Sequence, residues 1–256
     1  MSARIPGEEE LGVQRTIVRI GAIATAVAVG SGVAVAGTPA QAAPRVTTGA
    51  VVVTRAAAAS CATGKYQKQV EGYLKKLGGF GSVKVDGKQS AADCKAIKKF
   101  QSRYGIKPAA GLAGPTTNGV AKRLATTKTS SCKASKSKTT ICVDLTHQTV
   151  FVMKKGKVYA KPTVTRTGMK GYRTPTGTFK INKRTKKEWS NPYKVWMPYW
   201  QRFVGGVGLH QTTTYLHDGW RGSHGCVNLL ASDAKSLYGI GNVGMTVKVY
   251  GRRPGT

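Results

Sequence analysis

A cysteine and a histidine late in the chain have the residue types and spacing of a nucleophile and its base. Cys226 lies within the hexapeptide Ser-His-Gly-Cys-Val-Asn at residues 223–228, and His210 precedes it by sixteen residues. A thiolate activated by an imidazole attacks carbonyl groups and forms a thioester. The pattern therefore predicts acyl transfer, with Cys226 as the nucleophile and His210 as the base.

The residues around Cys226 predict a tight turn that exposes the sulfur. A side chain at position 225 would obstruct such a turn, and Gly225 has none. The same turn would leave the backbone N–H groups of His224, Gly225 and Cys226 free to face the oxyanion of a tetrahedral intermediate. A cysteine that reacts at neutral pH also needs its pKa below the free value of about 8.5, and an imidazolium or aimed N–H groups can lower it.

The histidines also allow a metal site as an alternative. His210, His217, His224 and Cys226 are all possible zinc ligands, but their spacings of seven, seven and two match no familiar ligand pattern. We therefore expect no metal and no cofactor. His147 falls in an expected hairpin turn and is interpreted as a surface residue, whereas His217 is either a polar loop residue or a substrate contact.

The charge of the chain limits the partners that it can have. Lys and Arg outnumber Asp and Glu by 41 to 10 in 256 residues, and the net charge is +31. Such a charge attracts polyanions, either nucleic acid or anionic polymers of a cell wall or membrane surface. The basic residues are spread along the chain, without zinc-finger spacing or a basic region attached to heptads, so we expect no specific nucleic-acid binding.

Residues 1–42 have the features of an export signal in the usual order. Arg15 and Arg19 precede an apolar run of small residues at 20–36, and Ala-Gln-Ala at 40–42 offers a cleavage site. The run has seventeen weakly hydrophobic residues, whereas a membrane span needs about 20. We interpret residues 1–42 as a cleaved signal peptide, with an uncleaved anchor as the alternative, and expect a secreted protein without a stable membrane span.

The five cysteines agree with export, because thiols outside the cell tend to pair. Cys61 and Cys94 flank one candidate domain, and Cys132 and Cys142 lie ten residues apart where the next domain begins. Proximity suggests the pairs Cys61–Cys94 and Cys132–Cys142, although four cysteines allow three connectivities. Cys226 is then left as a free, reactive thiol.

Hydrophobic spacing divides the exported chain into a helical part and a β part. Apolar residues at intervals of three and four predict a first helix at 66–77. A second helix is expected to begin at a capping box at Ser90 and to end at Gly105, and a third to begin after a cap at Thr116. Residues 127–140 are rich in Thr, Ser and Lys and predict a linker. From residue 141 the apolar period is two, which predicts strands, and residues 232–238 predict one short helix.

Two segments resemble known families. Val-Asp-Gly at 85–87, Ala-Ile-Lys-Lys-Phe-Gln at 96–101 and Gly-Leu-Ala-Gly-Pro-Thr at 111–116 are similar to the three-helix peptidoglycan-binding domain. Gly-Leu-His at 208–210 and the hexapeptide at 223–228 resemble the signature of the L,D-transpeptidase catalytic domain. The string Thr-Pro-Thr-Gly-Thr-Phe at 174–179 and Met-Pro-Tyr at 197–199 match that family too.

The second resemblance implies a role for each residue of the site. Cys226 would be the nucleophile and His210 the base, and the backbone carbonyl of Gln211 would hold the other imidazole nitrogen. Ser223, His224 and Asn228 would shape the loop and contact substrate, and Tyr199, Trp200 and Phe203 would line the donor groove or, alternatively, lie in the core. Family members usually have Gly or Ser where this chain has Gln211.

These observations predict an α+β protein with a small three-helix bundle and a mostly antiparallel, sandwich-like β domain. The domains expected are a signal peptide at 1–42, an irregular segment at 43–60, a peptidoglycan-binding domain at 61–126, a linker at 127–140, a catalytic domain at 141–250 and a tail at 251–256.

The resemblance implies a secreted, wall-associated enzyme. It would form 3→3 cross-links between peptidoglycan stem peptides through a Cys226 thioester, with release of D-alanine. Expected partners are donor and acceptor stems, glycan and anionic wall polymers. The alternatives are a non-catalytic peptidoglycan-binding protein, an L,D-carboxypeptidase or a metal-dependent wall hydrolase; nothing in the chain resembles a papain-like protease.

Overall fold

The computed structural model describes residues 61–218 and 221–256, which belong to one compact unit of the chain. The expected signal peptide and the irregular segment at 43–60 lie outside the described residues. Within the described ranges, every helix is too short or too polar to span a lipid bilayer. The helices in this part of the chain are α1 (Gln67–Leu77), α2 (Ala91–Arg103), α3 (Pro115–Thr126), the 3-10 helix η1 (Thr129–Cys132) and α4 (Ala231–Ile240).

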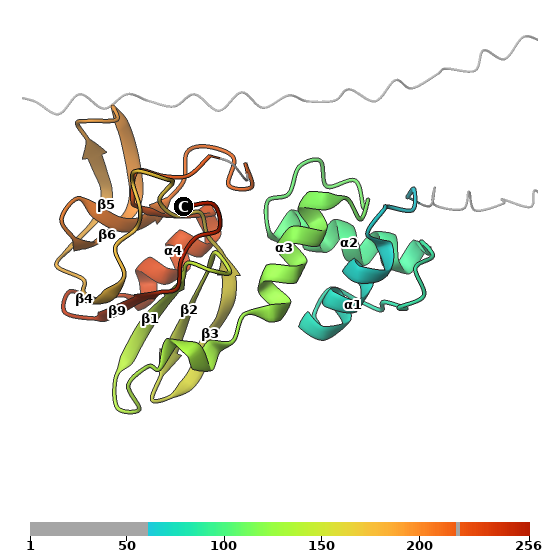
Figure 1. The fold of residues 1–256 in the computed structure, drawn as a ribbon, viewed down its shortest axis with the longest axis horizontal. Coiled ribbons are helices and arrows are strands. Elements are labelled where there is room, and N and C mark those ends of the chain that lie inside the picture. The colour runs from blue at the N-terminus through green and yellow to red at the C-terminus, as the bar shows by residue number, and fades with distance from the viewer. Residues whose placement is uncertain (1–60, 219–220) are drawn as a thin grey trace, which may run out of the picture. The chain divides into compact units, whose positions relative to one another are not determined.

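The strands form two sheets, which Figure 1 shows together with α4. One sheet has the order β3-β2-β1-β9-β4 and the other the order β5-β6-β7-β8. Most pairs are antiparallel, as expected, but β1 pairs with β9 and β7 with β8 in parallel. The strands are β1 (Thr139–Asp144), β2 (Thr149–Lys154), β3 (Lys157–Val164), β4 (Gly177–Lys180), β5 (Lys183–Ser190), β6 (Val195–Val204), β7 (Val207–Gln211), β8 (Val227–Leu229) and β9 (Thr246–Tyr250).

The main core joins apolar side chains from both sheets and from α4. Ile141 and Val247 of the first sheet, Leu209 and Val227 of the second and Leu237 of α4 belong to the same buried cluster. Burial of each such side chain contributes roughly 1.5–3 kcal/mol. The core thereby fixes the ends of β7 and β8, which carry the candidate site residues.

The helical part confirms most of the sequence prediction. Helix α1 ends before Gly78, and α2 begins with the capping box between Ser90 and Asp93. The cap predicted at Thr116 is wrong, because Gly114 is the N-cap residue and Pro115 occupies the first turn of α3. A proline is favoured there because its missing N–H would have had no partner within the helix.

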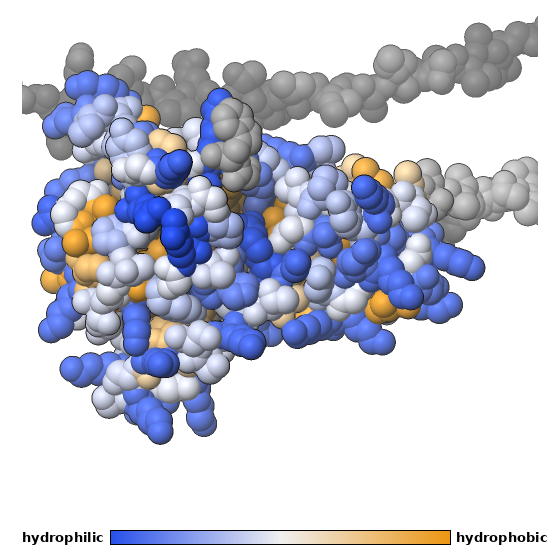
Figure 2. All heavy atoms as spheres, viewed as in Figure 1, coloured by the Kyte–Doolittle hydropathy of each residue, from blue (hydrophilic) through white to orange (hydrophobic). Residues whose placement is uncertain are grey.

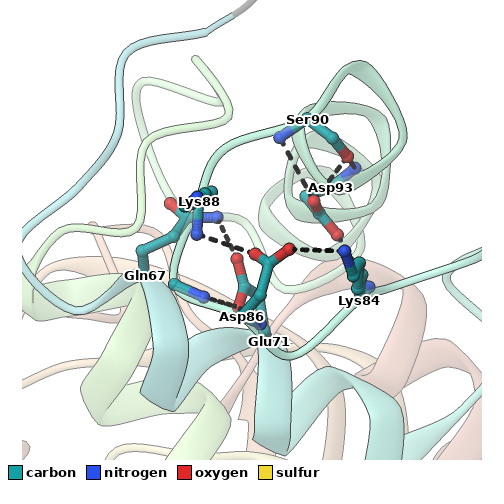
Figure 3. Close-up of polar contacts among 8 residues, drawn as sticks. Gln67, Glu71, Lys84, Asp86, Lys88, Ser90 and Asp93 are labelled. Atoms are coloured by element: carbon teal, nitrogen blue, oxygen red, sulfur yellow. Dashed lines mark hydrogen bonds and ion pairs between the residues drawn. The ribbon is translucent and has the colours of Figure 1, made fainter.

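A buried carboxylate holds the loop between α1 and α2 (Figure 3). Glu71 of α1 is 0 % exposed, and its Oε2 accepts hydrogen bonds from the backbone N–H groups of Asp86 (3.1 Å) and Gly87 (2.8 Å). Its Oε1 accepts a bond of 2.9 Å from Gln67. The Val-Asp-Gly string at 85–87 is therefore fixed by a side chain from the neighbouring helix.

The cysteines pair as proximity suggested. Disulfides join Cys61 to Cys94 and Cys132 to Cys142, and Cys226 is the free cysteine of the described residues. Cys132 and Cys142 pack with Phe151 and Met153 in a small separate core. The predicted linker is thus partly ordered, since η1 carries Cys132 into this core and β1 already begins at Thr139.

Replacing Glu71 with alanine tests the role of the buried carboxylate. Glu71→Ala leaves two partly buried loop N–H groups without their acceptor, and a buried polar group left unpaired costs roughly 1–3 kcal/mol. We expect urea unfolding to show a loss of at least about 1 kcal/mol. Lys75→Ala, an exposed change on the same helix, should stay within about 0.5 kcal/mol of the parent; equal losses in the two variants would contradict the assignment.

Candidate active site

Pairing of β7 with β8 brings the predicted base and the nucleophile loop together. The parallel register sets Leu209 opposite Val227 and His210 opposite Asn228. Cys226 immediately precedes β8, so the register places it beside the residues that precede His210. Cys226 and His210 line one cavity of 220 Å³ with Tyr193, Met197, Ser223 and Asn228.

Glycine is required at position 208, where β7 pairs with β6. A Cβ atom at Gly208 would lie 2.7 Å from the carbonyl oxygen of Gln201 and 2.8 Å from the ring of Trp200. Real Cβ atoms essentially never come this close to another heavy atom. A larger residue at this position would therefore push β7 away from β6. Trp200 and Phe203 are buried, and Phe203 belongs to the main core, which supports the core interpretation of both aromatics.

Both nitrogens of the His210 ring have partners. Nδ1 lies 2.8 Å from the carbonyl oxygen of Gln211, the contact that the family resemblance implied. Because a carbonyl only accepts, Nδ1 carries the proton and Nε2 is left as the acceptor. Asn228 Nδ2 donates to this Nε2 at 2.9 Å. The tautomer is therefore the one in which Nε2 can take a proton from a nucleophile.

Arg166 orients Asn228 in turn. Its Nη2 donates to Asn228 Oδ1 at 3.0 Å, which leaves the amide NH2 group to face His210. Asn228 is buried and its side chain is engaged on both sides, so it positions the histidine. The resemblance had implied contact with substrate. Nothing in the sequence distinguishes Arg166 from the other basic residues of this strongly cationic chain.

The loop that carries Cys226 is fixed by two hydroxyl groups. Ser223 Oγ donates to the carbonyl oxygen of Cys226 at 2.5 Å and accepts from the Gly225 N–H at 3.2 Å. Thr174 Oγ1 donates to the Gly225 carbonyl at 2.7 Å and accepts from the Gly168 N–H at 2.9 Å. Thr174 begins the Thr-Pro-Thr-Gly-Thr-Phe string, which the sequence pointed to without assigning it this role.

The turn has the conformation expected for an exposed nucleophile. Gly225 has φ of 111°, which L side chains rarely adopt, and a Cβ there would lie 3.1 Å from Val207. The Gly225 N–H is bound to Ser223, so it is not available to an oxyanion as predicted. The N–H groups of His224 and Cys226 make no hydrogen bond with any described residue, and they remain the candidates for oxyanion donors.

Two predicted site residues, Tyr199 and His217, lie outside the cavity, whereas His224 lines it as expected. Tyr199 packs against Tyr238 and the main core rather than lining the cavity. His217 lines a different cavity, and its Nε2 faces the carbonyl oxygen of Tyr104. His224 is exposed and stacks on Tyr193 with ring centroids 4.6 Å apart, so its ring shapes the rim beside Cys226.

The described residues contain no group of three or more His, Cys, Asp or Glu side chains placed to hold a metal ion. His217 lies in a separate cavity from His210 and Cys226. The arrangement of side chains therefore does not match the metal-dependent alternative.

Burial keeps the base and the thiol uncharged in the resting protein. Burial lowers the pKa of His210 to about 4, against the opposing hydrogen bond to Gln211, and the positive charge of Arg166 adds to the decrease. Burial also raises the pKa of the Cys226 thiol above its ordinary value. A backbone hydrogen bond with Gly208 opposes this increase. The direction is opposite to the lowered pKa that a cysteine reactive at neutral pH needs, and the sulfur lies 3.8 Å from the Gly206 carbonyl oxygen.

Comparisons with known proteins agree with this geometry. A family model described as the L,D-transpeptidase catalytic domain (YkuD) matches residues 138–249. A crystal structure of an L,D-transpeptidase from Stackebrandtia nassauensis is 54 % identical, with a TM-score of 0.75, and the match covers 77 % of this chain and 96 % of that chain.

A crystal structure of a mutant Enterococcus faecium L,D-transpeptidase is 31 % identical, and the match covers 44 % of this chain and 50 % of that one, with a TM-score of 0.39. A search of curated proteins finds no match. The fold and site define an acyltransferase of the cysteine-nucleophile class. The chain belongs to the L,D-transpeptidase family, whose members act on the stem peptides of peptidoglycan.

Substitution of Thr174 tests how the nucleophile loop is held. Thr174→Val keeps the shape of the side chain but leaves the Gly225 carbonyl and the Gly168 N–H without a partner. We expect faster amide hydrogen exchange at residues 223–226 and a loss of stability of roughly 1–3 kcal/mol. Thr178→Val, an exposed change in β4, is the matched control, and similar exchange in both variants would contradict the role of Thr174.

Alkylation tests the protonation state of Cys226. Because its pKa is raised, the thiolate fraction at pH 7 should be smaller than that of a free cysteine, whose pKa is about 8.5. We expect iodoacetamide to modify Cys226 more slowly than free cysteine at pH 7, with a rate that increases up to and beyond pH 9. A rate at pH 7 above that of free cysteine would instead show a resting thiolate–imidazolium pair.

Proposed function

We propose that this protein is a secreted, wall-associated L,D-transpeptidase that forms 3→3 cross-links through a thioester on Cys226. The observation that carries the proposal is the pairing of a free thiol with a histidine of fixed tautomer in one cavity. Cys226 and His210 both line it, and the Nδ1 bond to Gln211 leaves Nε2 as the base.

In the first half of the reaction, Cys226 attacks the amide that follows the third residue of a tetrapeptide stem. The resting structure shows no bond between the sulfur and the imidazole, and Asn228 donates to Nε2. As substrate enters, the Asn228 amide must therefore release Nε2, and the sulfur must leave the Gly206 carbonyl and reach this nitrogen. Its proton passes to Nε2 and the carbon–sulfur bond forms, while the N–H groups of His224 and Cys226 stabilise the oxyanion. The imidazolium then protonates the departing amine, the carbon–nitrogen bond breaks and D-alanine leaves.

In the second half, the side-chain amine of another stem attacks the thioester. His210 accepts a proton from this amine, the new amide forms and the carbon–sulfur bond breaks to restore the thiol. A buried, neutral imidazole suits both halves because it alternately accepts and donates one proton. Arg166 holds the Asn228 amide beside the ring at rest, and the Nδ1 bond to Gln211 keeps the ring in place when Asn228 releases Nε2.

The remaining features support wall association. The +31 charge favours a matrix of carboxylate and phosphate groups, and hydrophilic residues cover most of the face seen in Figure 2. Two disulfides are typical of proteins outside the cell. We propose that residues 1–42 direct export and that the helical part at 61–126 binds peptidoglycan.

Substitution of the two central residues tests the chemistry. Cys226→Ala should abolish release of D-alanine from a tetrapeptide stem and remove the acyl adduct seen by intact-protein mass spectrometry, while sedimentation with sacculi persists. His210→Gln should lower turnover by about 10²–10⁴-fold, the usual contribution of a general base.

His147→Gln, in a turn remote from the cavity, is the matched control for His210→Gln and should retain full turnover. Turnover by the Cys226→Ala protein would refute the nucleophile assignment. The mass of the released product shows whether an amine or water resolves the adduct, and water alone would favour an L,D-carboxypeptidase.

A further inference from the structure

A second cavity, of 560 Å³, lies on another side of Arg166 from the candidate active site. Arg123 and Val120 of α3 line it together with Arg166, His217 and Arg253. Neither Cys226 nor His210 is among its lining residues. A volume of this size is typical of sites for small molecules.

The cationic groups of this cavity are matched by little negative charge. Arg123 forms no ion pair with any residue in the described ranges. Asp218 is the one acidic residue among the described residues that line the cavity, and its Oδ2 lies 3.4 Å from Arg221 Nε.

Arg166 and Arg253 bind neutral oxygens in this region. Arg166 donates to the Tyr215 carbonyl at 2.8 Å and to Thr214 Oγ1 at 2.7 Å. Arg253 donates to the carbonyl oxygens of Thr167 and Arg221. The bonds of Arg166 fix its guanidinium group in place without neutralising its charge.

The charges repel one another at this site. Burial lowers the pKa of Arg123 to about 10, and the neighbouring charge of Arg253 contributes. Burial also lowers the pKa of Arg166, again with a contribution from Arg253, and Asp218 opposes this decrease. A bound anion would relieve the remaining repulsion, because Asp218 alone supplies negative charge among the described lining residues.

One further group could serve an anion here. His217 does not, because its Nε2 donates to the Tyr104 carbonyl and burial lowers its pKa to about 4, which leaves Nδ1 without a proton. Helix α3 begins at Pro115 beside the cavity, and its N-cap, Gly114, provides no capping side chain. The N-terminal end of a helix attracts negative charge because its first N–H groups have no partner within the helix.

We propose that this cavity binds a carboxylate or phosphate group at Arg123, with the positive charges of Arg166 and Arg253 in the same lining. Arginine suits both anions, because its planar fork of donors matches two of their oxygen atoms at once. The size of the cavity allows the anion to be part of a larger molecule. The two cavities share Arg166, but the proposal does not depend on the reaction at Cys226.

Titration of the full chain with inorganic phosphate and, separately, with malonate tests the site. We expect saturable binding by calorimetry, together with shifts of the Arg123 and Arg166 side-chain signals in NMR spectra. Tighter binding of malonate identifies a carboxylate as the preferred group, and tighter binding of phosphate a phosphate. The absence of saturable binding by either probe would overturn the proposal.

Substitutions distinguish binding at a specific site from general attraction of anions to a basic protein. Arg123→Gln should weaken binding by about tenfold or more, equivalent to about 1.4 kcal/mol. Arg123→Lys should weaken it less, because lysine keeps the positive charge but lacks the paired N–H donors of the guanidinium group. Lys98→Gln removes the same charge from an exposed position on α2 and should change binding by less than about twofold.

Equal weakening by Arg123→Gln and Lys98→Gln would show that only net charge matters and would overturn the proposal. Unchanged thermal unfolding of both proteins excludes a folding defect as the cause. Arg123→Gln should leave release of D-alanine from soluble stems unchanged, so failure of the transpeptidase proposal and failure of the anion site give different results.

Discussion

The parallel pairing of β7 with β8 is the constraint on which the candidate site depends. It sets His210 opposite Asn228 and Leu209 opposite Val227. Parallel neighbours need a long connection between them, and here the connection contains the nucleophile loop itself. The chain therefore leaves the sheet after the histidine and returns through Cys226 before β8 begins. A shift of this register by one residue would turn the side chains of β8 to the opposite face.

The pairing is stable because other parts of the protein enclose it. Leu209 and Val227 lie in the core shared with the first sheet and α4, while Gly208 lets β7 approach Trp200 closely. Thr174, outside both strands, binds the Gly225 carbonyl. Three parts of the protein thus fix the position of Cys226: β8, which follows it, the distant loop that contains Thr174, and the turn at Gly225. Such support favours a single productive geometry.

The electrostatics of the protein differ between its surface and its site. The chain carries a charge of +31, yet burial keeps His210 and Cys226 neutral at rest. Arg166 contributes to this state, since its positive charge adds to the lowering of the His210 pKa. The same guanidinium orients Asn228, so one residue sets both the charge state and the direction of the base. A neutral pair implies that the thiol loses its proton as substrate is attacked rather than beforehand.

Local patterns in the sequence predicted the elements and the central residues. Apolar spacing located the helices and the strands, the capping box marked the start of α2, and proximity suggested both disulfides. The hexapeptide and His210 identified the chemistry, because a thiol, a glycine turn and an imidazole are recognisable from residue type alone. These signals are local, or depend on the chemistry of single residues, and the sequence carries them directly.

Only the tertiary structure decided which groups act together. The chain order does not reveal that β9 joins β1 in parallel, that Thr174 bonds Gly225, or that Arg166 bonds Asn228, because these contacts join residues far apart in sequence. The same holds for Tyr199 and His217, whose residue types suited a substrate groove but whose strand and loop carry them elsewhere. The sequence by itself predicted the nucleophile and indicated its class of reaction. Packing determined the protonation states and partners of these groups, because burial and long-range hydrogen bonds exist only in the folded chain.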